Sequence, residues 1–469
     1  MINAAGLSFE MNKLLSALTV GLMASAALWA NPAQAQIQPL GAAPPVAAQP
    51  KGSKTIAPDA PVPGNPDFKA DSSQAQATAA PPPLPPAIWD VPNALDLLAA
   101  IGRAGADGLN PADYDPAGLQ SAIQSGNPML ISAAATQRFN LLSNDLALGH
   151  VKKPARVDWF VTDNDLNAEK QDTLLRAALA QHSVSATLTA LLPTHPQYAA
   201  LKNALAATAA DDAARRDRIR LNLDRWRWLP RDLGNKYIIV NVPGFYATLV
   251  EDGVNRWKQR AIAGKLSTPT PQLNATAVGV MLNPSWNVPK SIEKEAAGKK
   301  GFIPIKSADG KRVLYWQQPP GPTNALGQLK FVMPNSKAIY LHDTNARSRF
   351  NDSARALSHG CIRTQHIVDL ATELLGDDNG TWTPDKVQAA LDSKKSVQAN
   401  FVKPLPVYIV YFSSAGLNDG RIVDYRDLYG RDAKALAALK MRDGGSSLAS
   451  PDNDVATKPK PKPAQVANR

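Results

Sequence analysis

Between about residues 89 and 228, apolar side chains recur every three to four positions, the spacing of amphipathic α-helices. Asn93 is a candidate cap for a helix with an apolar face, and Asp115 followed by Pro116 has the order typical of a second helix start. Further helical repeats cover residues 130–148, 174–180 and 197–228. We therefore expect a helical domain over residues 89–234, in which Trp226 or Trp228 docks the last helix on the next domain.

After Gly234 the apolar pattern changes to alternation with period two, which predicts β-strands. The predicted strands cover residues 236–242, 245–251, 254–262, 275–282, 328–333, 338–342 and 406–412, and a helix is expected over 367–375. The fold class is thus a multidomain α+β protein, with a helical scaffold followed by a mostly β, sandwich-like domain over residues 235–435.

The two ends of the chain have compositions that do not form a core. Residues 1–35 resemble a secretory leader: Lys13 precedes an apolar run over 14–28, and Ala33-Gln34-Ala35 is a small-residue cleavage site. A membrane anchor is the alternative, but the run is shorter than the roughly 20 residues that span a bilayer. Residues 36–88 hold thirteen of the 39 prolines and predict an extended spacer, and residues 436–469 predict a disordered basic tail.

The formal net charge of +11 favours an acidic partner. Nucleic acid is a poor candidate, because no nucleic-acid motif is present and the lysines and arginines are spread along the chain. An exported protein with a carboxylate-rich partner fits both the leader and the charge.

One short stretch carries the candidate chemistry. Cys361, the only cysteine, lies in Ser358-His359-Gly360-Cys361-Ile362-Arg363, and His342 ends a predicted strand upstream. A thiol with a pKa near 8.5 needs a neighbouring base to act as a nucleophile at neutral pH. Gly360 permits a turn that directs successive backbone N–H groups towards one point, as in an oxyanion site. A buried, inert thiol is the alternative.

This stretch resembles the signature of the L,D-transpeptidases: His342, fifteen intervening residues, then Ser-His-Gly-Cys with a polar residue two positions later. The resemblance to the larger periplasmic branch of the family extends to the segments around Arg225-Trp226-Arg227-Trp228, Asn283–Pro289 (including Trp286), Gly321–Gly327, Lys330-Phe331 and Pro334-Asn335, and to Arg355. It covers roughly residues 90–415.

The resemblance implies acyl transfer in the periplasm, in cell wall biogenesis and maintenance of cell shape. Cys361 would attack the carbonyl preceding the terminal D-alanine of a peptidoglycan tetrapeptide stem, release D-alanine and form a thioester. An amine of a second stem would then resolve the thioester and give a 3-3 cross-link. Carbapenems would be covalent inhibitors, and no cofactor or metal is implied.

The resemblance also distributes roles among residues. His342 is the expected general base, while Gly360, His359 and Ser358 support the oxyanion site or close the turn. Arg363, Asn335 and Trp286 are expected to bind substrate, with Arg363 suited to a bidentate contact with a carboxylate. Residues 290–318, basic and without clear periodicity, are either a cap over the substrate groove or an ordinary surface loop.

Several alternatives stay open at the level of sequence. Water could resolve the thioester, which would make the protein a hydrolase or L,D-carboxypeptidase, and some relatives attach outer-membrane proteins to the wall. A non-catalytic wall-binding scaffold is a further alternative. His342, His359 and Cys361 could also supply three zinc ligands, but no typical zinc-binding spacing supports this.

Overall fold

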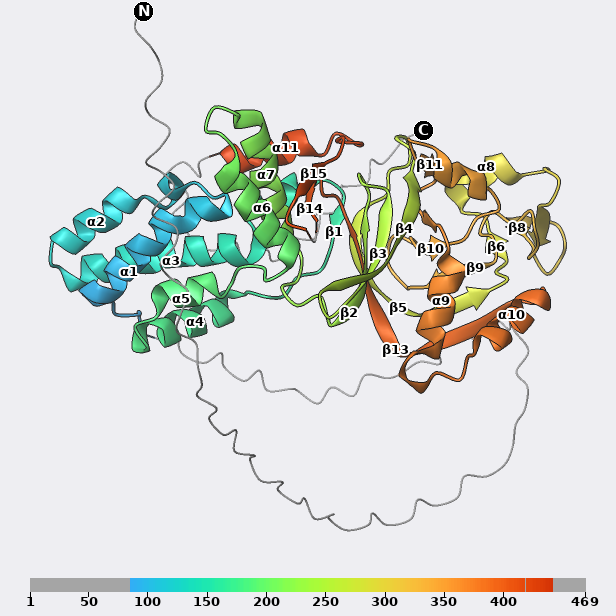
Figure 1. The fold of residues 1–469 in the computed structure, drawn as a ribbon, viewed down its shortest axis with the longest axis horizontal. Helices are drawn as coiled ribbons and strands as arrows, with labels where there is room; N and C mark the ends of the chain where they lie inside the picture. Colours follow the sequence, from blue (N-terminus) through green and yellow to red (C-terminus); the bar gives the residue numbers. More distant parts are fainter. Residues whose placement is uncertain (1–84, 418, 442–469) are drawn as a thin grey trace, which may run out of the picture. The chain divides into compact units, whose positions relative to one another are not determined.

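The computed structural model describes residues 85–417 and 419–441 (Figure 1). The expected leader, nearly all of the proline-rich spacer and most of the expected basic tail lie outside these residues. Within them, no helix combines the length and apolar character needed to span a membrane. The predicted fold class is confirmed: a helical region is followed by a mostly β region.

The scaffold consists of helices that share one apolar core, built from residues such as Leu97, Ile101, Phe139 and Leu142. Asp115 caps α2 and Pro116 begins it, as predicted. The cap of α1 is Asp90, whose carboxylate accepts the Asn93 N–H at 2.8 Å; the prediction that Asn93 is the cap was wrong. The helices are α1 (Val91–Arg103), α2 (Pro116–Gln124), α3 (Pro128–Leu148), α4 (Ala168–Ala180) and α5 (Val184–Thr189), with 3₁₀ turns η1 (Ala104–Asp107), η2 (Pro111–Tyr114) and η3 (Lys153–Ala155).

The last predicted scaffold helix is two helices, α6 (Pro196–Ala207) and α7 (Ala213–Trp226). The break has a local cause, since Asp212 leaves the helical conformation and its side chain caps α7 at the Arg215 N–H, 3.1 Å away. Trp226 stacks on Phe412 with ring centroids 4.8 Å apart, so one of the two tryptophans does dock the scaffold on the β domain.

The β domain is one mixed sheet that closes on itself. Strands β5, β13, β2, β3, β4, β12, β10 and β9 pair in that order, and β9 also pairs with β5. Closure leaves no free edge within this ring. The bounds are β1 (Trp159–Phe160), β2 (Lys236–Asn241), β3 (Tyr246–Glu251), β4 (Val254–Gly264), β5 (Gln272–Leu282), β9 (Leu329–Val332), β10 (Leu341–His342), β11 (Ala356–Ser358), β12 (Ile362–Thr364) and β13 (Val397–Val410).

The core of this domain combines inward-facing strand residues with two helices. Helix α9 (Ile367–Gly376), close to its predicted bounds, contributes Leu370 and Leu374, and α10 (Pro384–Asp392) contributes Val387. Each fully buried aliphatic side chain of this kind stabilises the fold by about 1.5–3 kcal/mol. The 3₁₀ turns of this part are η5 (Arg347–Asn351) and η6 (Asp377–Asn379).

Residues 286–318 form a small unit with its own sheet, β6-β8-β7, and its own apolar cluster around Val288, Ile292 and Trp316. The elements are β6 (Trp286–Asn287), η4 (Lys290–Ile292), α8 (Glu293–Ala296), β7 (Ile303–Lys306) and β8 (Val313–Gln318). The segment that the sequence left open as cap or loop therefore has regular structure, and below it is called the cap.

After β13 the chain returns to the scaffold through β14 (Ser414–Gly416), β15 (Ile422–Asp424) and α11 (Asp432–Lys440). In Figure 1, α11 lies beside α7, and Ala435 and Leu439 share a buried cluster with Leu221 and Trp228. The basic tail was predicted to start at residue 436, but this position lies inside α11, because the helix has an apolar face to bury.

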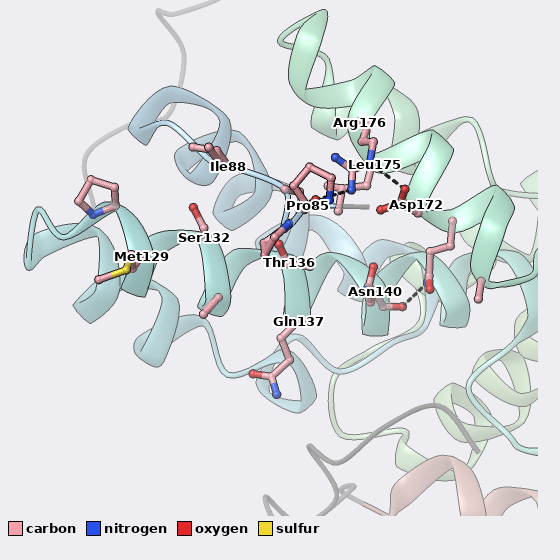
Figure 2. A pocket seen from close by; sticks show the side chains of 16 residues that line it. Pro85, Ile88, Met129, Ser132, Thr136, Gln137, Asn140, Asp172, Leu175 and Arg176 are labelled. Carbon is pink, nitrogen blue, oxygen red and sulfur yellow. Dashed lines mark hydrogen bonds and ion pairs between the residues drawn. The ribbon is translucent and has the colours of Figure 1, made fainter. Parts of the chain in front are cut away.

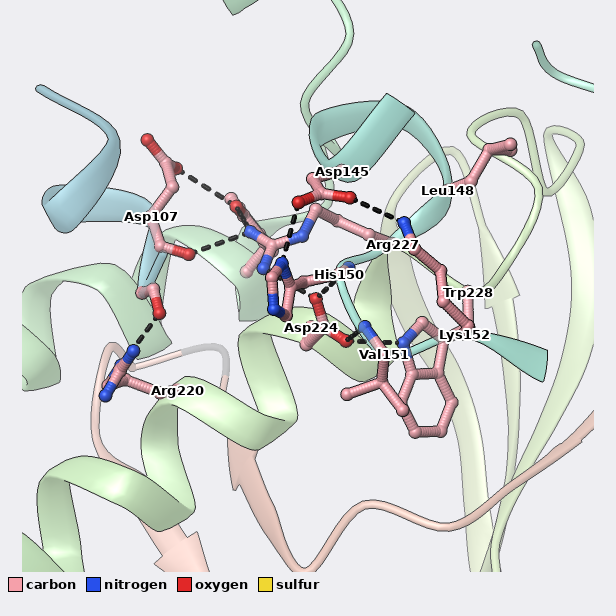
Figure 3. A network of polar contacts seen from close by, with 12 residues as sticks. Asp107, Asp145, Leu148, His150, Val151, Lys152, Arg220, Asp224, Arg227 and Trp228 are labelled. Carbon is pink, nitrogen blue, oxygen red and sulfur yellow. Dashed lines mark hydrogen bonds and ion pairs between the residues drawn. The ribbon is translucent and has the colours of Figure 1, made fainter. Parts of the chain in front are cut away.

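A buried polar network lies where α7 meets the helices before it (Figure 3). Asp224, fully buried, accepts the N–H groups of His150 (2.8 Å) and Val151 (3.0 Å), the Trp228 indole N–H (2.8 Å) and the Arg227 guanidinium (2.9 Å). Burial raises the pKa of Asp224, but the charges of Arg227 and Arg156, together with the hydrogen bonds from Arg227 and the His150 N–H, lower it to about 2. The network fixes α7 to the chain around residue 150.

Candidate active site

Strand register gathers the candidate side chains on one face of the sheet. In the parallel pair β10–β12, His342 is opposite Arg363, and in the antiparallel pair β10–β9 it is opposite Lys330. Because side chains alternate along a strand, the neighbours Leu341 and Ile362 point the other way, into the core, and both are fully buried. His342, Arg363 and Lys330 therefore share a face that is not the core face.

Cys361 lies in the bend immediately before β12, beside Tyr340 and close enough to Lys330 and Arg363 for their charges to act on its thiol. The Ile362 N–H donates to the Tyr340 carbonyl at 3.0 Å, and the Tyr340 hydroxyl and backbone N–H both hydrogen-bond the Cys361 sulfur. The sulfur is also 3.7 Å from the Ala338 carbonyl oxygen. Burial raises the pKa of the Cys361 thiol, and the two Tyr340 contacts and the charges of Lys330 and Arg363 oppose this only in part. The resting group is a thiol, so attack requires a base.

His342 is buried and neutral. Its side chain is only 5% exposed and its Nδ1 has no hydrogen-bond partner among the described residues. Burial first, and then the positive charges of Arg363 and Lys330, lower its pKa to about 3. The imidazole is therefore neutral at pH 7 and able to accept a proton, and its ring lies 5.6 Å from that of Tyr340.

The turn before Cys361 is held by Ser358. The Ser358 hydroxyl donates to the Cys361 carbonyl at 2.6 Å and accepts the Gly360 N–H at 3.1 Å. Gly360 has φ of 115°, a left-handed conformation that favours glycine. Since the Gly360 N–H is bonded to Ser358, the N–H that stays without a partner among the described residues is that of Cys361.

His359 points to the cap. Its Nε2 lies 3.2 Å from the Glu295 carboxylate of α8 and 3.0 Å from Lys265 Nζ. This geometry connects the turn before Cys361 to the cap.

The three residues expected to bind substrate have different surroundings. Arg363 makes no hydrogen bond or ion pair within the described part of the chain, and its Nε is buried without a partner. Asn335 uses its amide within its own loop, with Met333 O at 2.8 Å and Ile339 O at 2.7 Å. Trp286, in β6 of the cap, hydrogen-bonds the Tyr340 side chain. Helix α9 starts at Ile367, after β12, so Cys361 is not in its first turn and its dipole does not act on the thiol.

Two comparisons with family models cover most of the described chain. Residues 235–395 match the L,D-transpeptidase catalytic domain (YkuD), and residues 86–205 match a scaffold domain. The chain carries an L,D-transpeptidase catalytic domain. The resemblance inferred from the sequence motif is thereby confirmed.

A candidate L,D-transpeptidase of Haemophilus influenzae is 33% identical over 240 residues, which is 46% of this chain and 48% of the relative. The match thus spans about half the length of that relative. Among solved structures, a Mycobacterium smegmatis L,D-transpeptidase has 17% identity, 38% and 58% coverage of the two chains and a TM-score of 0.20. An Enterococcus faecium L,D-transpeptidase has 12% identity, with coverage of 39% of this chain and 52% of that chain, and a TM-score of 0.22. Such low scores add nothing to the assignment.

The L,D-transpeptidase domain contains two site residues that the sequence analysis did not select. Tyr340 lies two residues before His342, so strand alternation outward from the histidine could have identified it. Lys330 is brought opposite His342 by the β9–β10 pairing, which no local pattern reveals. Both lie against Cys361 closely enough to change the pKa of its thiol.

A separate groove of about 840 Å³ lies in the scaffold, between α3, α4 and residues 85–88 (Figure 2). Its wall includes Met129, Thr136 and Leu175, and Arg176 donates to the Pro85 carbonyl at 2.7 Å across it. None of the site residues lines this groove. In the described parts of the chain, no group of three or more His, Cys, Asp or Glu side chains is arranged to hold a metal ion.

Proposed function

We propose that this protein is a peptidoglycan L,D-transpeptidase, with Cys361 as nucleophile and His342 as general base. The observation that carries the proposal is the Cys361 thiol next to a sheet face that holds a neutral His342 imidazole and two cations, Arg363 and Lys330, which have no anionic partner among the residues that the structure describes. This composition suits an acyl donor that carries a carboxylate next to the bond to be cleaved.

The chemistry follows in two balanced halves. The thiol proton passes to His342 as Cys361 sulfur attacks the carbonyl that precedes the terminal D-alanine of a tetrapeptide stem. Collapse of the tetrahedral intermediate breaks the amide bond, and His342 returns the proton to the departing amine of D-alanine. An amine of a second stem then attacks the thioester, loses a proton to His342 and restores the thiol, which gives a 3-3 cross-link.

The negative charge that develops on the carbonyl oxygen needs a donor close by. The Cys361 N–H is available for this role because it has no partner among the described residues, whereas the Gly360 N–H is bonded to Ser358. One such donor contributes about 3–4 kcal/mol to the transition state. The Tyr340 hydroxyl stabilises the thiolate before attack.

The decisive experiment is incubation of the purified protein with tetrapeptide muropeptides. Free D-alanine together with 3-3 cross-linked dimers is the expected result. Tripeptide monomers without dimers would indicate that the protein is a hydrolase and not a cross-linking enzyme. If the folded protein gave no turnover, a non-catalytic wall-binding scaffold would be favoured. Intact-mass analysis after imipenem treatment provides a second measurement: the adduct is expected on the wild type and absent from Cys361→Ala.

The setting of this activity is part of the proposal. The expected leader, the net charge of +11 and the proline-rich spacer support export to the periplasm and work on an anionic wall. Stem peptides are the proposed acceptors, and outer-membrane proteins are the alternative acceptors that the same thioester could serve.

A further inference from the structure

The loop over residues 264–270 contacts the turn before Cys361 through hydrogen bonds to the Ser358 and Gly360 carbonyls. The Lys265 N–H donates to the Ser358 carbonyl at 2.9 Å, and the Thr268 hydroxyl donates to the same oxygen at 3.2 Å. The Thr270 hydroxyl donates to the Gly360 carbonyl at 2.7 Å and accepts the Gly264 N–H at 2.9 Å. Thr270 is fully buried and lies 90 residues before Gly360 in the sequence.

The contact with Gly360 has a stereochemical consequence. The Gly360 carbonyl and the Cys361 N–H belong to one peptide plane and point in opposite directions across it, because the peptide bond is planar and trans. Fixing the carbonyl therefore fixes the direction of the N–H. With φ of 115° at Gly360, this peptide would otherwise have the rotational freedom of glycine.

Thr270 is in turn held by the segment that follows β15. The Tyr429 hydroxyl accepts the Thr270 N–H at 3.3 Å and donates to the Gly264 carbonyl at 2.6 Å. The Arg431 guanidinium donates to the Thr270 carbonyl at 2.9 Å and to the Asp158 carboxylate at 2.7 Å. Arg431 is 2% exposed and its guanidinium lies over the rings of Tyr411 and Tyr429. The N–H, the hydroxyl and the carbonyl of Thr270 thus each have a hydrogen-bond partner.

We propose that Thr270, supported by Tyr429 and Arg431, is a positioning residue that aims the Cys361 N–H at the oxygen of the reacting carbonyl. The proposal rests on the proposed function, in which that N–H stabilises the developing oxyanion. Thr270 itself does not touch the substrate. It acts through the Gly360–Cys361 peptide, so its loss affects the formation of the tetrahedral intermediate and leaves substrate binding in place.

The test compares Thr270→Val, which keeps the shape but removes the hydroxyl, with Thr270→Ser, which keeps the hydroxyl. For acylation by imipenem, followed by intact mass, we expect the rate constant of Thr270→Val to fall about 10- to 100-fold with the half-saturating concentration within about twofold. Thr270→Ser is expected to stay within about threefold of the wild type. An unchanged rate in Thr270→Val, or equal losses in both variants, would overturn the proposal.

Alkylation of Cys361 by iodoacetamide distinguishes an effect on oxyanion stabilisation from an effect on the reactivity of the thiol. Alkylation displaces iodide at a saturated carbon and creates no oxyanion, so its rate should be the same in Thr270→Val and the wild type. A parallel fall in alkylation and acylation would mean that Thr270 acts on the thiol, and the proposal would be wrong. A wild type that is alkylated but never acylated by imipenem would instead overturn the proposed function.

Two further variants keep the proposal testable if Thr270→Val does not fold. Tyr429→Phe removes a hydroxyl one step further from Gly360, and we expect a fall of about 3- to 10-fold in acylation with alkylation unchanged. Ser143→Ala removes an equally buried hydroxyl from α3, where it contacts Asn140 and Gln171, and should leave the acylation rate of folded protein unchanged. If Tyr429→Phe behaves like Ser143→Ala while Thr270→Val does not fold, the proposal fails.

Discussion

His342 and Arg363 are directly opposite each other in the parallel pair β10–β12, so an imidazole and a guanidinium with no ion-pair partner among the described residues share one surface. Their proximity is part of the reason why the imidazole is neutral, since the guanidinium charge adds to burial in lowering its pKa to about 3. The same arrangement leaves the guanidinium available to an anion. Each half of this relationship leads to a measurable consequence.

Replacement of His342 by glutamine is expected to lower kcat about 10²- to 10⁴-fold, because the thiol, whose pKa is raised by burial, loses its proton acceptor. In the wild type the rate should show no acid limb near pH 6.5, the usual imidazole pKa, since this ring stays neutral down to about pH 3. Acylation by imipenem from pH 5 to 8 provides the measurement. A wild-type rate that falls with a midpoint near 6.5 would contradict the assignment.

The free energy of unfolding should depend on pH because of His342. Between pH 6.5 and about 3 the unfolded chain binds a proton at residue 342 and the folded chain does not. The free energy of unfolding is therefore highest, as far as this group is concerned, above pH 6.5, and it decreases as the pH falls towards 3. From pH 7 to 5 the wild type should lose about 2 kcal/mol more free energy of unfolding than His342→Gln. Urea denaturation at both pH values tests this, and parallel losses in the two proteins would refute it.

Arg363 should recognise the carboxylate next to the scissile bond. With a tetrapeptide stem, Arg363→Ala is expected to raise KM about 10- to 100-fold, as expected for a charge-assisted bidentate contact of about 1.5–3 kcal/mol. A stem whose terminal carboxylate is converted to an amide is the matched control. Amidation should weaken binding to the wild type and have little effect on Arg363→Ala; equal losses in both would mean that the guanidinium binds elsewhere.

The contact between His359 and Glu295 joins the turn before Cys361 to the cap at 3.2 Å. Both side chains are partly exposed, so the contact should contribute only about 0.2–1 kcal/mol. Glu295→Gln is therefore expected to raise KM about 1.5- to 5-fold at low salt, and the difference should shrink as salt is added. Glu293→Gln in the same short helix, which removes the pair with Lys290, is the control and should leave KM unchanged. A salt-independent effect would exclude an ionic cap contact.

Asp224 should matter for folding and not for chemistry. Its carboxylate accepts four hydrogen bonds in a site without solvent access, and Asp224→Asn leaves the buried Arg227 charge without its partner. We expect a loss of about 3–5 kcal/mol in the free energy of unfolding. Asp419→Asn, at an exposed pair with Arg421, should change stability by no measurable amount. If the folded Asp224→Asn protein reacted with imipenem more slowly, the network would have a role beyond stability.

The sequence identifies features whose cause is local. Cys361 and its turn can be recognised from neighbouring residues, and Asp115-Pro116 is sufficient to start α2. The break between α6 and α7 was missed because Asp212 caps a helix within a continuous polar run that also suits a helix. The strand predicted over 338–342 reduces to Leu341–His342, since Ala338 has φ of 51° and Asn335 organises the loop before it.

Features that depend on pairing between distant segments are not visible in the sequence. Lys330 reaches the site only through the β9–β10 register, and Thr270 reaches Gly360 across 90 residues. Nothing in the neighbourhood of Thr270 distinguishes it from other threonines in turns. The position of its hydroxyl depends on Tyr429 and Arg431, which follow Thr270 by 159 and 161 residues in the sequence.

Strand β13, formed from residues 397–410, pairs on one side with β5 and on the other with β2, although it is the last strand of the ring in chain order. A chain that emerges N-terminus first must therefore keep β2 and β5 apart, each with a bare edge, until some 170 further residues have followed β2. The ring that carries His342 and Arg363 is therefore completed only when residues 397–410 have joined it.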